Sequence, residues 1–485
     1  MTKMKPIQAA FFGLLTVLLG GALVWWLLGR PATGIDDADI FLVYARNFAE
    51  GHGFVYNVGG ERVEGFTSML WTLICSVFWH TCASVPVPLL LLNVLFCGAA
   101  AAACLRRTER PVLYLALLGA SPAWFAWCQT TLMESGLWCL LVTLLVLAVA
   151  ERRTVAVCLL LPLLVLTRPE SIAWGAWACL ILAFSKGWKS ALWPAAVFGA
   201  SLLALVGFRL SYFGYPVPNT YYAKVSPDLF SNIWSGLGYL FGYAFSNPAA
   251  LLALLFLCVV LARRGPGFWV ALALLPGLGI PVLVGGDHFG AYRFFQPLWP
   301  LLCLLVAREW LQWSSNFCPR VMKTVPVVLL AVGWLLFPAT ANLEHEFRIA
   351  REGRANGEAL TAMFSDLADW PTVAVITAGG SKLAYAGTVQ DLMGLNSTEM
   401  AHAPGPHTGF KNHTGFSKVV FYRWMPDVLL CGDSAEFDAL VLQGLHSEPR
   451  FMERYEKRAL RRNGRELDAY YRRGFLAGLG IQAKE

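Results

Sequence analysis

Long apolar runs of roughly 15 to 25 residues recur from Ile7 to about Asn342, each bounded by charged residues or by Gly and Pro. A helix that crosses a bilayer needs about 20 predominantly apolar residues, because its backbone polar groups must be satisfied within the segment. The chain is 57% hydrophobic and only 14% charged, whereas an ordinary soluble domain is about 25% charged. These features predict a mainly α, polytopic membrane protein. Eleven transmembrane helices are predicted, at residues 8–28, 86–105, 111–129, 135–150, 154–168, 170–185, 190–213, 235–260, 267–284, 292–307 and 324–341.

The basic residues of the connecting loops predict the orientation of these helices. With the N-terminus in the cytoplasm, the inner loops carry 14 Lys and Arg residues, whereas the outer loops before residue 343 carry six. This excess follows the positive-inside rule and places the first outer loop, residues 30–85, on the far side of the membrane. An apolar stretch at residues 66–82 would reverse every later loop if it crossed. It is therefore interpreted as an outer-leaflet or re-entrant helix, with a full crossing as the alternative.

The chain is predicted to divide into a transmembrane domain, residues 1–342, and a soluble domain on the outer side, residues 343–485. The second part opens with a charged helical stretch at residues 344–352. Strand-like apolar pieces then predict a small α/β domain, and they lie at residues 372–377, 427–431 and 437–442. Residues 454–473 are predicted to form a basic helix, which is either a solvated face or a contact for anionic headgroups or an acidic glycan.

Cysteine usage and net charge narrow the class of protein. Eleven of the twelve cysteines lie in or beside apolar runs, and only Cys431 lies in the polar part of the chain. The thiols are therefore interpreted as small packing residues rather than as a disulfide framework. The net charge of +7 is accompanied by no zinc-ligand spacing and no aromatic–basic strand pattern, so no nucleic-acid partner is expected.

Ionisable and polar side chains cluster at the helix junctions that the predicted orientation places on the outer side. Such groups are costly near a membrane and are usually functional. The carboxylates are Asp36, Asp37, Asp39, Glu134, Glu170 and Asp287, and the other candidates are Arg168, Asn219, Tyr222, Lys224, His288 and Arg293. A site built from them could deprotonate a hydroxyl with a carboxylate while Arg, Lys and Tyr hold a phosphate. Transfer of a sugar from a lipid phosphate requires this combination.

Asp36 and Asp37 are the candidate catalytic residues. Two neighbouring carboxylates at a partly dry interface repel each other, so one is expected to titrate higher and act as the base while the other orients the acceptor. The alternative is that the pair caps the N-terminus of the helix that follows, where Asp is favoured.

The cations are candidate ligands of the donor phosphate. Arg168 precedes Pro169, which ends a helix, and its guanidinium suits bidentate phosphate binding. An ion pair with Glu170 or snorkelling is the alternative for Arg168, and Arg293 has the same alternatives. The remaining predicted phosphate ligands are Lys224, Tyr222 and His288, of which the first two could instead anchor the chain at the headgroups.

Five polar residues are predicted to bind the transferred sugar or the acceptor. For Glu134, capping of a helix start is an equal alternative. No set of metal-ligating residues is predicted, although the acidic cluster could hold a divalent cation as a cofactor. The predicted substrate-binding residues are Asp39, Glu134, Glu170, Asn219 and Asp287.

Several ordered motifs resemble those of the GT-C glycosyltransferases. The first outer loop carries the closest match, in Asp36-Asp37-Ala38-Asp39-Ile40, Gly51-His52-Gly53-Phe54 and Glu61-Arg62-Val63-Glu64-Gly65. Further elements follow in order, at Met133-Glu134-Ser135-Gly136, Arg168-Pro169-Glu170, Pro218-Asn219-Thr220, Lys224, Gly285-Gly286-Asp287, Gly394-Leu395-Asn396 and Pro426-Asp427-Val428. Each motif is weak alone, but together they span nearly the whole chain and resemble the branch of the mycobacterial terminal β-(1→2)-arabinofuranosyltransferases.

The resemblance implies a GT-C fold and an inverting glycosyltransferase that uses a polyprenyl-phosphate sugar donor. It implies that the base is Asp36 or Asp37 and that the protein lies in a bacterial inner membrane, with its C-terminal domain in the periplasm. The transferred sugar is expected to be arabinofuranose or another pentose or hexose, and the acceptor an envelope glycan or surface protein. The alternative is a transporter or flippase of lipid-linked sugars, although transporters place their polar sites near the midplane in repeated halves.

Overall fold

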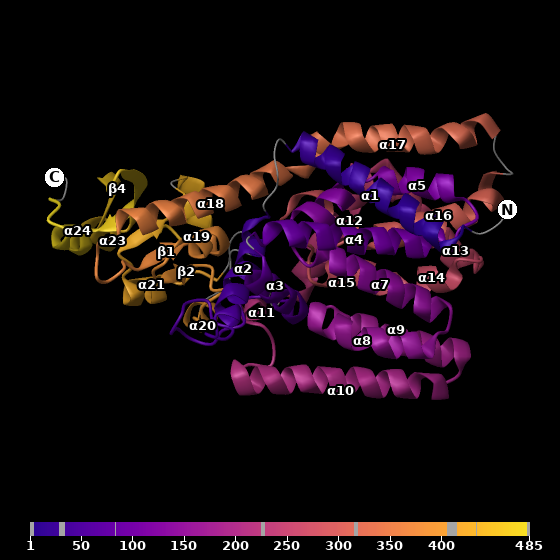
Figure 1. Ribbon diagram of the computed structural model, residues 1–485, viewed down its shortest axis with the longest axis horizontal. Helices are drawn as coiled ribbons and strands as arrows, with labels where there is room; N and C mark the ends of the chain where they lie inside the picture. The colour runs from indigo at the N-terminus through magenta and orange to yellow at the C-terminus, as the bar shows by residue number, and fades with distance from the viewer. Residues whose placement is uncertain are drawn as a thin grey trace.

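The computed structural model describes residues 4–28, 34–82, 84–224, 228–314, 319–404, 415–432 and 434–482. The structure is mainly helical and contains a single five-stranded sheet within these residues. Figure 1 shows a bundle of long helices at one end and a lobe that contains the sheet at the other. Helix α18 (Leu343–Met363) runs from the bundle into the lobe, and α2 (Asp36–Ala49) lies between the two parts.

The helices of the bundle are apolar and often begin at a proline, whose missing N–H group costs nothing in the first helical turn. Pro6, Pro86, Pro111 and Pro248 each occupy such a position. The bundle consists of α1 (Pro6–Leu27), α4 (Pro86–Leu105), α5 (Pro111–Gly119), α6 (Pro122–Phe125), α7 (Ser135–Ala150), α8 (Thr154–Thr167), α9 (Ser171–Lys186), α10 (Lys189–Tyr212), α12 (Leu229–Ser246), α13 (Pro248–Arg263), α14 (Phe268–Ala273), α15 (Leu275–Leu283), α16 (Trp299–Ser314) and α17 (Pro319–Ala341).

Several bundle helices carry outward-facing apolar side chains that suit lipid rather than water. In α10, Trp193 is 74% exposed and Leu203 is 75% exposed. Among the described residues, α1, α4 and α10 are long and apolar enough to cross a membrane alone. Up to six crossings result if each of three bent helix pairs forms one span. The apolar helices support a membrane protein, whereas the count of eleven spans stays a prediction.

Three predicted spans differ from the helices that the structure contains. The predicted span at 235–260 is not one straight helix, because α12 and α13 meet at 115°, and whether the bent pair crosses as one span stays a prediction. Asn247 caps α13 through its side chain and Pro248 follows, so the first helix cannot continue. The span at 111–129 is bent by 76° before Pro122 and ends in a π-helix, η1 (Ala126–Thr130). The span at 292–307 begins later, at α16, after the short 3₁₀ turns η2 (Gly290–Tyr292) and η3 (Gln296–Leu298).

The apolar stretch at 66–82 contains α3 (Met69–Thr81), a helix of 13 residues. At about 1.5 Å per residue it is roughly 20 Å long, shorter than the hydrocarbon core of about 30 Å. It packs against α2 at the end of the bundle nearest the lobe (Figure 1). These features support an outer-leaflet or re-entrant helix rather than a full crossing.

The sheet of the lobe has the strand order β2-β1-β3-β5-β4. Strand β1 (Val373–Val375) pairs in parallel with β2 (Val389–Asp391) and β3 (Val428–Leu430), whereas β5 (Arg465–Arg472) is antiparallel to β3 and to β4 (Tyr455–Arg462). Besides α18, the helices of the lobe are α19 (Ala378–Ala384), α20 (Thr398–Ala401), α21 (Lys418–Trp424), α22 (Ala435–Leu440), η4 (Leu445–Ser447), α23 (Pro449–Arg454) and α24 (Arg473–Gly478).

Two predictions for the lobe are wrong. Residues 454–473 form the β4–β5 hairpin instead of a basic helix, because Asn463 and Gly464 both adopt positive φ angles, 48° and 73°, as a tight hairpin turn requires. Residues 437–442 lie largely in α22 instead of a strand, because the side chain of Ser434 accepts a hydrogen bond from the backbone N–H of Phe437 at 3.1 Å and caps that helix.

The lobe docks on α2 through buried polar contacts. Asp39 is fully buried, and its two oxygens accept hydrogen bonds from Arg354 of α18 at 2.7 and 2.8 Å. Tyr56 donates to the carbonyl of Ala378 at 2.5 Å. A Cβ atom at Gly379 would lie 1.9 Å from the backbone oxygen of Asp36, so only glycine allows this approach of α19 to α2. The junction is therefore a close-packed interface of fixed geometry.

We expect Asp39→Asn to lower the free energy of unfolding by about 3 to 5 kcal/mol, because the largely buried Arg354 loses its counter-charge. Chemical unfolding of the protein in detergent measures the change. The matched control is Arg348→Ala, which removes an exposed pair with Glu352 at 3.8 Å and should cost less than about 1 kcal/mol. Equal, small effects of both substitutions would contradict a docking role for Asp39.

Candidate functional site

A cavity of about 820 Å³ lies where the bundle meets the lobe. On the bundle side, α2 contributes Asp36 and Asp37, α11 (Asn219–Lys224) contributes Lys224, and the segment after α15 contributes His288. Helix α18 adds Glu346. The opposite wall belongs to the lobe and includes residues that follow β1 and β3. Titratable groups far apart in the sequence therefore face one shared space.

Asp36 lies in the first turn of α2, but it does not cap that helix, whose N-cap residue is Ile35. Its carboxylate instead accepts hydrogen bonds from the backbone N–H groups of Gly379 and Gly380 at 3.0 and 2.8 Å. Burial raises the pKa of Asp36 to about 6, although the two glycine N–H groups oppose the increase. The neighbouring Asp37 carboxylate raises this pKa further. Asp36 is thus held in one orientation and titrates close to neutral pH.

Asp37 faces the cations of the site. Its Oδ2 atom lies 3.5 Å from Nη1 of Arg293. Burial raises the pKa of Asp37, but Lys224, Arg293 and His288 outweigh burial and lower that pKa below its usual value. The two adjacent carboxyls are therefore unequal, as expected, with Asp36 as the group of higher pKa.

Arg293 is fixed by contacts on several sides. It pairs with Asp287 as well as with Asp37, and its guanidinium lies 4.1 Å from the centre of the Phe289 ring. Asp287 in turn lies 3.2 Å from Nδ1 of His288. The chain reaches this position through Ala291 and Tyr292, which have φ angles of 57° and 53°. Left-handed backbone at two consecutive non-glycine residues is strained, and such strain tends to concentrate at functional sites.

A narrow, mainly apolar crevice lies in the bundle beside the cavity. Arg293 lines it, and so do Arg168 and Glu170. Arg168 pairs with the fully buried Glu134 and with Glu170, from which its Nη2 atom lies 2.8 Å away. The ion pair with Glu170 considered as an alternative is therefore present. The apolar part of the crevice is lined by Trp138, Trp174, Gly277, Ile280, Pro281, Val284, Phe294, Pro297 and Leu298.

Five predicted site residues line neither space. Two of them, Glu134 and Asp287, pair with Arg168 and Arg293. Both buried oxygens of Asp39 accept hydrogen bonds from Arg354, so the contacts of Asp39 are those of a docking residue, and a role as a substrate ligand stays a prediction. Asn219 is also buried, and its side-chain N–H group donates to carbonyls of the lobe, with the shortest bond, 2.7 Å, to Gly394. Tyr222 lies against His402 with ring centres 4.2 Å apart, outside the cavity lining. The side chains of Asp39, Asn219 and Tyr222 thus connect the bundle to the lobe.

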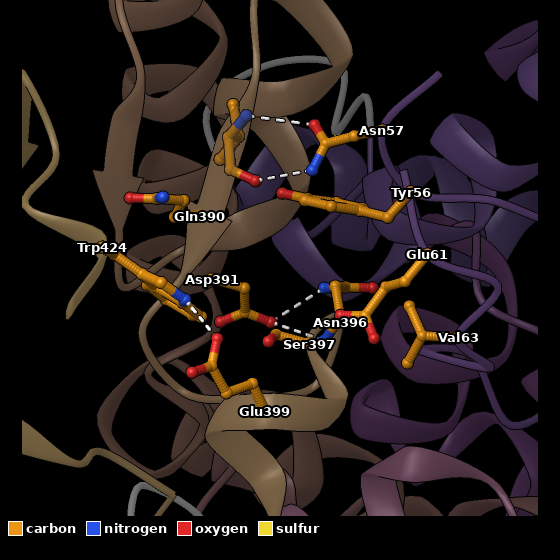
Figure 2. Close-up of a pocket in the computed structure, with 11 residues that line it drawn as sticks. Tyr56, Asn57, Glu61, Val63, Gln390, Asp391, Asn396, Ser397, Glu399 and Trp424 are labelled. Carbon is orange, nitrogen blue, oxygen red and sulfur yellow. Dashed lines mark hydrogen bonds between the residues drawn. The ribbon is translucent and has the colours of Figure 1, made fainter. Parts of the chain in front are cut away.

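A second polar pocket, of about 310 Å³, lies between the first outer loop and the lobe (Figure 2). Its acidic groups are engaged by neighbouring residues of the chain. Asp391 accepts two bonds from Asn396, both at 2.9 Å, and Glu399 accepts a bond from Trp424 at 2.7 Å. Asn57 pairs with the backbone of β2. The pocket is part of the docking interface, and none of the predicted site residues lines it.

The sequence did not predict that residues of α18 and the lobe contribute to the site. Glu346 belongs to the charged stretch at 344–352, and Gly379 and Gly380 follow the strand predicted at 372–377, but none of the three was predicted as a site residue. The paired glycines were the available signal, because consecutive glycine N–H groups can approach a carboxylate closely. Among the described residues, no group of three or more His, Cys, Asp or Glu side chains is arranged to hold a metal ion. A bound divalent cation stays a prediction.

Comparison with the models of known protein families and with curated proteins finds no match to this sequence. The likeness to GT-C glycosyltransferases therefore remains an interpretation of motifs. The function proposed below therefore rests on the geometry of the cavity, the crevice and Arg293.

Proposed function

We propose that the protein is an inverting glycosyltransferase that moves a sugar from a polyprenyl-phosphate donor to an envelope glycan or surface protein. One observation carries the proposal. Arg293 lines an apolar crevice in the bundle and also contacts Asp37, which lines the cavity together with other titratable groups. A polyprenyl-phosphate sugar has an apolar chain, an anionic phosphate and a hydroxylated sugar in that order. These parts match the apolar crevice, Arg293 and the cavity in the same order.

The donor is proposed to bind with its phosphate beside Arg168 and Arg293 and with the start of its isoprenoid chain against the apolar side chains of the crevice, whose volume of about 40 Å³ leaves the rest of the chain outside it. Lys224 also lines the cavity, where its positive charge lowers the pKa of Asp37 and would attract the donor phosphate. These cations would stabilise the negative charge that builds on the leaving phosphate, as preorganised electrostatics require. Glu134, Glu170 and Asp287 keep the two arginines paired and positioned when no donor is bound.

The reaction is proposed to be a single displacement. Asp36 takes the proton of the acceptor hydroxyl while that oxygen attacks C1 of the sugar, and the bond from C1 to the phosphate oxygen breaks on the opposite face. Asp36 suits this role better than Asp37, because a base works best when its pKa lies near the working pH. Asp37 holds Arg293 and orients the acceptor. The anomeric configuration inverts, and the polyprenyl phosphate leaves.

A transporter of lipid-linked sugars is the rival function. The cavity is lined by residues of α2, α11, α18 and the lobe. Figure 1 shows α2, α11 and the lobe at one end of the long helices rather than midway along them. A transporter site is expected near the midplane, so this position supports the enzyme. The proposal also places the protein in a bacterial inner membrane with the N-terminus in the cytoplasm and the lobe in the periplasm. The sugar is proposed to be arabinofuranose or another pentose or hexose.

We expect Asp36→Asn to lower kcat by about 10²- to 10⁴-fold, because the amide cannot accept the acceptor proton. Asp37→Asn should mainly raise KM for the donor, since Arg293 then loses one of its two carboxylate partners. Transfer of radiolabelled sugar from synthetic polyprenyl-phosphate donors to envelope fractions measures both. Asp369→Asn, which alters an exposed carboxylate of the lobe, is the matched control.

Normal transfer by Asp36→Asn, Asp37→Asn and the double variant would overturn the proposed enzyme. The rival is tested with proteoliposomes that contain lipid-linked sugar. Movement of that lipid across the bilayer with no transfer to an acceptor would identify a transporter instead.

The pH dependence of the reaction follows from Asp36. Only the ionised carboxylate can act as a base, and its pKa is raised to about 6. We therefore expect kcat/KM to fall tenfold per pH unit below about pH 6, rather than below about pH 4 as for an ordinary Asp. A pH–rate profile measures this limb. The residual activity of Asp36→Asn should not show this fall in kcat/KM. If the fall is unchanged in that variant, another group causes it.

A further inference from the structure

The side of the cavity that belongs to the lobe includes a cysteine, and a histidine and an aspartate of the lobe lie next to this cysteine. Cys431 follows the last residue of β3 and lines the cavity. Its Sγ atom lies 3.2 Å from Nε2 of His446. On the other side of the ring, Nδ1 of His446 lies 3.3 Å from Oδ1 of Asp438, a residue of α22. This is the arrangement of nucleophile, base and orienting carboxylate found in thiol hydrolases.

The imidazole ring is held rigidly. It is stacked on Tyr470 of β5, with ring centres 4.6 Å apart and planes at 20°, and its other neighbour is Phe451 at 5.3 Å. Asp438 Oδ1 also accepts a hydrogen bond from the backbone N–H of His446 at 3.1 Å. The carboxylate favours the proton on Nδ1, which leaves Nε2 to take the proton of the thiol. The ring is therefore fixed in both tautomer and direction.

The surroundings of Cys431 differ from those of the other described cysteines, which lie in helices of the bundle or beside them. A thiol that served only as a packing group would need no fixed imidazole beside it. Leu430, Phe437 and Leu440 line the same wall, so an apolar group could rest next to the sulfur. The space in front of them is the 820 Å³ cavity, which is large enough for a small organic substrate.

We propose that Cys431 is the nucleophile of a second catalytic centre, which transfers the acyl group of a small ester. His446 is its base, and Asp438 is a positioning residue. The sulfur attacks the carbonyl carbon, a C–S bond forms and the C–O bond of the ester breaks. His446 delivers the thiol proton to the departing oxygen, so an alcohol leaves and an S-acyl cysteine remains. Water then attacks the thioester, which releases a carboxylic acid and restores the thiol.

The first experiment measures the thiol itself. The full-length protein in detergent is treated with iodoacetamide across a range of pH, and mass spectrometry follows alkylation at each cysteine. An ordinary thiol has a pKa of about 8.5 and is only about 1% ionised at pH 6.5. At pH 6.5 we expect Cys431 to be alkylated at least about 10-fold faster than an ordinary thiol. His446→Gln should abolish the advantage, and Asp438→Asn should shift the pH profile toward that of an ordinary thiol.

The second experiment tests acyl transfer with p-nitrophenyl acetate. We expect a burst of one p-nitrophenol per chain and an acetyl group on the peptide that contains Cys431, both lost in Cys431→Ala. Cys258→Ser, which removes an exposed thiol of α13, should keep the burst. The wild-type pH profile does not depend on how well any variant folds. Alkylation of Cys431 with an ordinary pH profile, or acetylation independent of His446, would overturn the proposal.

Discussion

The seating of the lobe on α2 is the constraint on which the rest of the structure depends. The buried pair of Asp39 and Arg354 fixes that helix against α18, and the backbone of Gly379 touches the backbone of Asp36. The same contact supplies the two N–H groups that orient the Asp36 carboxylate. A single interface therefore joins the two sides of the cavity and orients the Asp36 carboxylate.

Ion pairs hold the charged side chains in place on the bundle side of the cavity. Buried ions are costly unless they are paired, and here each arginine is shared between at least two carboxylates. Arg168 and Arg293 consequently keep their positions without a ligand. Cations that are already oriented can stabilise a developing charge without reorganising, which is how electrostatic preorganisation lowers a barrier. On the lobe side, the thiol of Cys431 lines the same cavity and lies beside the imidazole of His446.

Local signals explain why some elements were predicted correctly and others were not. The charged helix at 344–352 and the strands at 372–377 and 427–431 follow clear patterns of polarity, and α18, β1 and β3 occupy them. The hairpin of β4 and β5 was assigned as a helix because its many charges outweighed the turn signal of Asn463-Gly464. The long apolar run at 235–260 concealed a sharp bend, since hydrophobicity does not report direction and only Asn247-Pro248 marks the break.

The sequence by itself determined that the chain has apolar helices suited to a membrane, a polar lobe with a small sheet, and ionisable groups gathered at the helix junctions. Composition and periodicity are local properties, so they can be read without coordinates. Only the tertiary structure decided which of those groups share a cavity. It separated Asp36 and Asp37 into unequal carboxyls, assigned Asp39 and Asn219 to docking, and placed Cys431 beside His446. Those distinctions depend on burial and on contacts between distant segments, which no local pattern encodes.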